Sequence, residues 1–193
     1  MLAEPDATLN LASLLGYQRD DLSAEGLLAP DPERLLPLDL TLVGPLTWRV
    51  RVQRVGGSDD AYLLEGKLSG TAKMPCRRCL DEVDVPINAS LLYSMDYAPS
   101  SHPSEGGLSL RDGEDEDVLV IERPQIDVSE LLLEVFALEL PLTVLCRPDC
   151  KGLSPEGVNL NDHPEAASVA SATHEDEPAD NASPFAVLKD LDL

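Results

Sequence analysis

The amino-acid sequence predicts an α+β protein: an antiparallel β-meander sheet covered by one main α-helix, with a zinc-knuckle-like cysteine site and disordered acidic loops. Three observations predict this class. Apolar and polar residues alternate with a period of two between 46 and 97, one apolar segment follows at 131–140, and the four cysteines fall into two close pairs. A chain of 193 residues can hold one domain with a substantial core or two small domains.

Three successive strands form the predicted sheet. The first runs over 46–53, the second over 64–74, and the third over 83–97, where the alternation is clearest. Strands joined by such short connections pair as antiparallel hairpins. Further short strands are expected at 39–43 and 118–122.

The main helix is expected at 131–140. A capping-box pattern at 127–130 precedes it, and Pro141 ends it. A short helix is also predicted at 8–15. The stretch 20–37 is rich in Pro, Asp and Glu and is interpreted as an irregular connection.

The expected domain organisation follows from composition. Residues 1–160 are predicted to form a single α+β domain, interrupted by a flexible acidic loop at 98–117 that has few apolar residues. Residues 161–183 are predicted to be a disordered acidic linker. Residues 184–193 regain apolar character and are predicted to be a short C-terminal docking segment.

The four cysteines, Cys76, Cys79, Cys146 and Cys150, are the candidate metal ligands. Four thiolates complete the tetrahedral shell of a structural zinc ion. The 66 residues between Cys79 and Cys146 exceed the spacing of compact zinc modules. Two alternatives therefore stay open: four reduced structural thiols, or redox chemistry at the first pair, which a hairpin position does not favour.

The net charge of the chain limits the classes of molecule that it can bind. The chain has 14 Lys and Arg against 36 Asp and Glu, a net charge of −22, which disfavours non-specific binding to nucleic acid or anionic lipid. Residues 49–78 form an island of net charge +4. An RNA-phosphate patch and an ordinary solvated strand face are both open interpretations of this island. The candidate RNA-binding residues are Arg49, Arg51, Lys67, Lys73, Arg77 and Arg78.

No residue pattern indicates an enzyme. The histidines His102, His163 and His174 lie in loop-like segments, and no nucleophile or phosphate-binding motif is present. His163 is either a spare metal ligand or a surface histidine. The N-terminus lacks a targeting pattern and no apolar run approaches ~20 residues, so a cytoplasmic, membrane-free protein is expected.

Several ordered motifs together resemble the YceD family, the large ribosomal RNA subunit accumulation proteins. They are Cys-Arg-Arg-Cys-Leu at 76–80, Ile-Asp at 126–127, Leu-Pro-Leu at 140–142, the second cysteine pair running into Lys-Gly-Leu at 151–153, Gly-Val-Asn-Leu-Asn at 157–161, and Pro-Phe-Ala-Val-Leu at 184–188. The resemblance implies a non-enzymatic factor for accumulation or processing of 23S rRNA, with the four cysteines as ligands.

The expected partners are therefore a large-subunit precursor, its rRNA, or a basic ribosomal protein, with no small-molecule substrate. Zinc is the expected cofactor, in a structural role. A second hypothesis is an acidic interaction or chaperone-like module that binds a basic ribosomal protein without RNA contact. A third, a thiol oxidoreductase, requires a cysteine with a pKa well below the free value of ~8.5.

Overall fold

The fold is known from a computed structural model, which describes residues 7–30, 32–38, 40–56, 60–111 and 118–166. These residues form two compact units. The first unit contains 7–75 and 82–144, and the second contains 76–81 and 145–166. The prediction of one domain over 1–160 stays a prediction.

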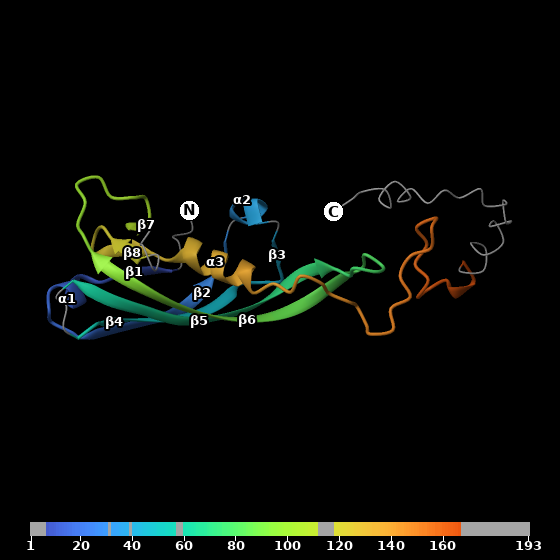
Figure 1. Ribbon diagram of the computed structural model, residues 1–193, viewed down its shortest axis with the longest axis horizontal. Coiled ribbons are helices and arrows are strands. Elements are labelled where there is room, and N and C mark those ends of the chain that lie inside the picture. The colour runs from blue at the N-terminus through green and yellow to red at the C-terminus, as the bar shows by residue number, and fades with distance from the viewer. Residues whose placement is uncertain (1–6, 31, 39, 57–59, 112–117, 167–193) are drawn as a thin grey trace, which may run out of the picture. The chain divides into compact units, whose positions relative to one another are not determined.

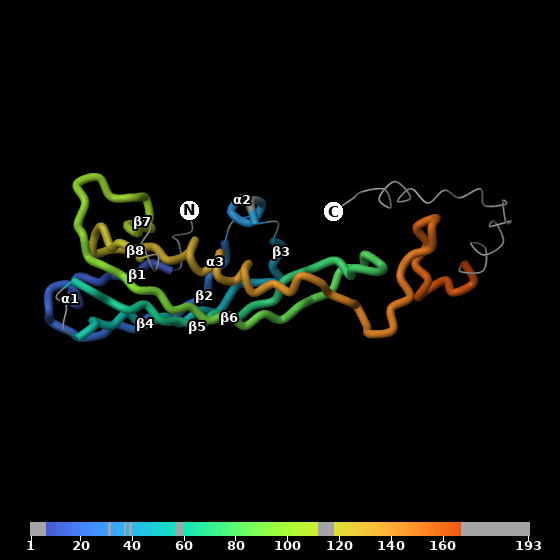
Figure 2. The backbone as a smooth tube through the Cα atoms, viewed as in Figure 1, coloured from blue at the N-terminus to red at the C-terminus, as the bar shows by residue number. Residues whose placement is uncertain are grey.

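Three long strands dominate the first unit. They are β4 (Leu46–Arg54), β5 (Ala61–Pro75) and β6 (Glu82–Tyr97). They pair in antiparallel order, so the predicted three-strand meander is confirmed. Figure 2 shows their backbones running beside one another. Apolar residues of β4 and β5 alternate toward one buried face, where Trp48 is 3% exposed, and polar residues alternate toward the other.

Four further strands extend the meander into a seven-stranded sheet. They are β2 (Asp21–Leu28), β3 (Thr41–Leu42), β7 (Leu108–Arg111) and β8 (Val118–Ile121). β2 pairs with β4, β3 with β5, and β7 with β8, all antiparallel. The sheet is mixed because β8 pairs with β6 in parallel. The short strands predicted near 39–43 and 118–122 are thereby confirmed.

The predicted fold class is wrong. The described chain is mostly β, with a seven-stranded mixed sheet and three short α-helices, and it is not a meander covered by one main helix. The largest error is β2, which lies in the stretch predicted to be irregular. Its Glu, Ala and Gly residues are poor strand formers. An eight-residue ladder with β4 stabilises the strand nevertheless, and that ladder is a tertiary interaction.

The smaller elements also differ from the prediction at the N-terminus. The expected helix at 8–15 is instead β1 (Thr8–Asn10), which pairs with β9 (Gln125–Asp127), followed by the single turn α1 (Ala12–Leu15). Backbone pairing with β9 satisfies groups that a helix would have paired internally. The remaining elements are α2 (Pro32–Leu35), η1 (Leu36–Leu38) and, in the second unit, η2 (Pro164–Ala166).

Helix α3 (Ser129–Leu138) packs against β5 and β6 (Figure 1). The predicted capping box at 127–130 is not formed: the residue before the helix is Val128, which makes no side-chain cap, and Glu130 pairs with Arg34 at 3.6 Å. The Asp127 carboxylate instead accepts from the Ser129 amide at 2.9 Å, a local turn contact. Phe136 is fully buried. It lies so close to Gly70 that an added Cβ would sit 3.3 Å from its ring and 2.3 Å from Leu46. Gly70 therefore provides the space for this contact.

The stretch predicted as a flexible acidic loop is partly ordered. Strand β7 forms within it, and Ser104 and Ser109 both donate to Glu122. Residues 112–117, most of the predicted linker 161–183, and the docking segment 184–193 lie outside the described residues. Within the described ranges, no helix has the length and apolar character needed to cross a membrane.

Candidate metal centre

The first cysteine pair occupies the turn 76–81 in the second unit. The Cys76 amide donates to the Asp81 carbonyl at 2.8 Å, and the Leu80 amide donates to the Cys76 carbonyl at 2.9 Å. Leu80 has a φ of 64°, in the left-handed region that L residues rarely adopt. These contacts close the chain into a tight loop that carries two thiols two residues apart.

The second pair, Cys146 and Cys150, lies in the segment 145–166 of the same unit. Gly152 follows with a φ of 81°, and its Cβ position lies 3.2 Å from the Arg78 carbonyl oxygen. A side chain there would face both an unfavourable φ and a close carbonyl. Glycine at 152 therefore lets this segment approach the turn 76–81.

The four sulfurs all lie within 4.8 Å of one another. The Sγ atoms of Cys76 and Cys150 are 3.8 Å apart, and those of Cys79 and Cys146 are 3.5 Å apart. Tetrahedral zinc with Zn–S bonds of about 2.3 Å separates its sulfurs by about 3.8 Å. The thiols therefore fit a tetrathiolate zinc ion. Cys146 is exposed and the other three cysteines are buried.

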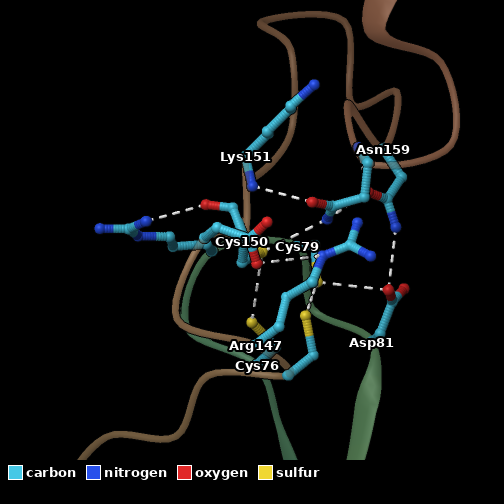
Figure 3. A network of polar contacts seen from close by, with 11 residues as sticks. Cys76, Cys79, Asp81, Arg147, Cys150, Lys151 and Asn159 are labelled. Carbon is cyan, nitrogen blue, oxygen red and sulfur yellow. Dashed lines mark hydrogen bonds and ion pairs between the residues drawn. The ribbon is translucent and has the colours of Figure 1, made fainter.

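Polar contacts join the two segments independently of the thiols (Figure 3). Arg78 donates to the Cys150 carbonyl at 2.8 Å, and the Asn159 amide group donates to Asp81 at 2.9 Å. The same Asp81 carboxylate accepts from the Cys79 thiol at 3.2 Å. The ligand positions are thus held by a hydrogen-bonded frame.

Asn161 connects that frame to one sulfur. Its side-chain nitrogen donates to the Cys150 Sγ at 3.3 Å, and its side-chain oxygen accepts from the Lys151 amide at 2.8 Å. The Asn159 side-chain oxygen accepts from both the backbone and the side chain of Asn161. Such secondary contacts orient ligands and raise metal affinity.

The surroundings of the thiols lower the pKa of some and raise the pKa of others. The Cys79 amide is the main cause that lowers the pKa of Cys76 to about 6. The Asn161 side chain lowers the pKa of Cys150, whereas burial raises the pKa of Cys79. A zinc ion would require thiolates, and Cys76 and Cys150 are the two candidate ligands whose surroundings lower the thiol pKa.

The structure thus brings together all four predicted ligands, while zinc occupancy stays a prediction. His163 is outside the thiol cluster: its Nδ1 lies 3.2 Å from the Glu165 carboxylate. This contact is that of a surface histidine.

The predicted RNA-binding residues are divided between the two units. Arg77 and Arg78 belong to the turn 76–81, and the other four lie on the polar face of the sheet. Three of these four form ion pairs with carboxylates. The pairs are Arg49 with Glu25 at 2.6 Å, Arg51 with Asp21 at 3.0 Å and Glu65 at 3.5 Å, and Lys73 with Glu82 at 2.8 Å. Lys67 lines a hollow of about 580 Å³ on that face.

Two of those carboxylates, Asp21 and Glu25, come from β2, the strand that sequence reasoning missed. A period-two pattern across 21–28 was the available signal, weakened by poor strand formers. Sequence reasoning also did not assign a role to Asp81 or Asn159. Asn159 lies in the motif 157–161, but its partner Asp81 is 78 residues away and is identified only by the fold.

Comparisons with known proteins bear on the same residues. A family model described as "Large ribosomal RNA subunit accumulation protein YceD" matches residues 64–192, a range that includes all four cysteines. Uncharacterized proteins of Mycobacterium bovis and of two strains of Mycobacterium tuberculosis are each 30% identical over 139 residues.

The alignment with these relatives covers 72% of this chain and 58% of each relative. The chain therefore spans less than two thirds of the length of these mycobacterial proteins. No solved structure matches it significantly. The family match covers more than half of the chain and confirms the resemblance drawn from the motifs. By this match the chain belongs to the YceD family of large ribosomal RNA subunit accumulation proteins.

Proposed function

We propose that this protein is a non-enzymatic, cytoplasmic factor that promotes accumulation or processing of the 23S rRNA of the large ribosomal subunit. The observation that carries the proposal is the family match over 64–192. The same range contains the one group of three or more clustered metal-ligand side chains found in the described part of the chain. The role in large-subunit rRNA comes from the family, and the residue assignments come from the geometry.

We propose a structural role for zinc at this centre. Cys76 and Cys79 lie in one segment and Cys146 and Cys150 in the other, so one ion would crosslink positions about 70 residues apart. A bound zinc supplies folding free energy and no redox chemistry. Arg78, Asp81 and Asn161 would hold the ligands in place.

A second candidate function has an observation of its own. Because Arg49, Arg51 and Lys73 are paired with carboxylates, the sheet face offers little uncompensated positive charge. The net charge of −22 suits a basic ribosomal protein as partner. The chain would then act as an acidic interaction or chaperone-like module and reach the precursor without touching RNA.

The first test is metal content. Protein purified without added zinc is expected to contain about one zinc ion per chain, and Cys76→Ser is expected to lose it. Leu80→Ser is the matched control, because Leu80 is 62% exposed in the same turn and is not a ligand. No zinc in the wild type would remove the metal from the proposal.

The second test is association with precursors. Tagged protein in a lysate at low salt is expected to sediment with large-subunit precursors, and cells lacking the protein are expected to accumulate less 23S rRNA. Absence of both effects would contradict the ribosomal role, whatever the metal content.

A further inference from the structure

The basic residues in the described part of the second unit all lie beside its cysteines. Arg77 and Arg78 separate Cys76 from Cys79, Arg147 follows Cys146 directly, and Lys151 follows Cys150 directly. The contacts that bring the four thiols together therefore also bring together cations from sequence positions about 70 residues apart.

Three of these four cations have free or weakly held charges. Within the described residues, Arg77 and the Lys151 Nζ have no ion-pair or hydrogen-bond partner, and Arg147 lies 3.9 Å from Asp149, the outer limit of an ion pair. Lys151 is anchored through its backbone amide, and its side chain extends away from the sulfurs (Figure 3). Arg78 differs, because its guanidinium donates to the Cys150 carbonyl.

The sheet face shows the opposite situation. Arg49, Arg51 and Lys73 each contact a carboxylate at 3.0 Å or less. An anion would have to displace those carboxylates to bind there. Charge available for binding is therefore greater at the metal centre than on the sheet positions that the sequence first suggested.

We propose that Arg77, Arg147 and Lys151, here termed the cationic rim, bind phosphates of an RNA backbone when the metal centre joins its two segments. This inference rests on the proposed function and names the contact it would use. Arginine and lysine are the usual phosphate ligands, and arginine can bind phosphate in a bidentate manner. Residues 76–81 and 145–166 of the second unit include no Phe, Tyr or Trp, so the rim has no aromatic side chain on which successive bases could stack, and phosphate contacts are the main ones it offers.

A competing explanation is charge compensation inside the centre. Zinc with four thiolates carries a net charge of −2, which nearby cations would stabilise. Arg78 already makes a direct contact with this centre through the Cys150 carbonyl. If the rim served the same purpose, its removal would weaken zinc binding and not only RNA binding.

The experiment compares two triple variants of the full chain. Arg77, Arg147 and Lys151 are changed to Gln in the first, and Arg49, Arg51 and Lys73 to Gln in the second. Both lose three positive charges, so the second is the matched control. Binding of a labelled mixed-sequence single-stranded RNA is measured against salt concentration, with zinc-loaded protein and with protein stripped by a chelator. Zinc content and precursor sedimentation are measured on the same samples.

The expected result is salt-dependent RNA binding by the zinc-loaded wild type and by the control variant. The rim variant should retain zinc and bind more weakly, with a salt slope reduced by about 2, since each single-strand phosphate contact contributes about 0.7. Stripping the metal should weaken binding in the wild type, because only the hydrogen bonds between the two segments then hold the rim cations near one another.

Four results would overturn the inference. They are equal loss of RNA binding in both triple variants, loss of zinc in the rim variant, unchanged binding after metal removal, and no RNA binding by the wild type. In the last case, continued sedimentation with large-subunit precursors would leave the proposed function standing through a protein contact. Loss of sedimentation as well would remove both.

Discussion

The hydrogen bond from Asn161 to Cys150 offers a direct test of how the candidate metal centre is built. The Asn161 side chain donates to the Cys150 Sγ at 3.3 Å, and no ligand is itself changed when this residue is substituted. Asn161→Ala removes the donor. Asn161→Asp keeps an oxygen for the Lys151 amide and replaces the donor with a carboxylate beside a thiolate.

The expected magnitudes differ between the two variants. A hydrogen bond to a charged group contributes about 1.5–3 kcal/mol, so Asn161→Ala should weaken zinc binding about 10- to 100-fold. Two negative charges about 4 Å apart repel by about 1 kcal/mol in water and about 4 kcal/mol at an effective dielectric constant of 20. Asn161→Asp should therefore weaken zinc binding by a further factor of about five or more.

The assay is a competition titration with a zinc chelator at neutral pH on wild type, both variants and Asn88→Asp. Asn88 lies exposed on β6 in the first unit, so its substitution makes the same chemical change away from the thiols. The expected order of zinc affinity is wild type and Asn88→Asp first, then Asn161→Ala, then Asn161→Asp. Equal affinities for all four proteins, or an Asp variant that binds as tightly as the Ala variant, would refute the reasoning.

Two further predictions concern the first unit. Hydrogen bonds led by the Ser104 amide lower the pKa of Glu122 below its ordinary value of 4.5, so its contribution to stability is present above about pH 4.5 and is lost as pH falls through the lower folded-state pKa. Glu122→Gln should therefore destabilise the protein in urea unfolding at pH 7, with a difference that shrinks on acidification; a constant difference would contradict this. Gly70→Ala should lower the free energy of unfolding by about 1–3 kcal/mol, because its Cβ would lie 2.3 Å from Leu46. Gly56→Ala is the control, because nothing lies within 4 Å of its Cβ position, and it should change the free energy of unfolding little. Both variants are measured by urea unfolding, and an equal change in the two would contradict the steric argument.

Local residue patterns were enough to predict the long strands, the candidate ligands and the family. Period-two alternation is a property of the strand backbone, so β4, β5 and β6 could be predicted from their residues alone. The two cysteine pairs likewise predicted a candidate metal site, because four thiols suit a single zinc ion. The family could be identified from short motifs in a fixed order.

Features that depend on contacts between distant segments could be identified only from the folded chain. β2 has a weak local preference for a strand and forms because β4 supplies its ladder, and its Asp21 and Glu25 then neutralise Arg51 and Arg49. These ion pairs could not be predicted from local sequence, since the two residues of each pair lie 24 or 30 positions apart in the chain.

The candidate metal centre also depends on contacts between segments that are distant in the sequence. Sequence spacing could suggest the four ligands, but their separation within 4.8 Å, the Asp81–Asn159 contact and the cations gathered around them exist only once two distant segments meet. The cysteine spacing was therefore enough to predict the candidate ligands. Contacts between distant segments determine which basic side chains are paired with carboxylates and which are not.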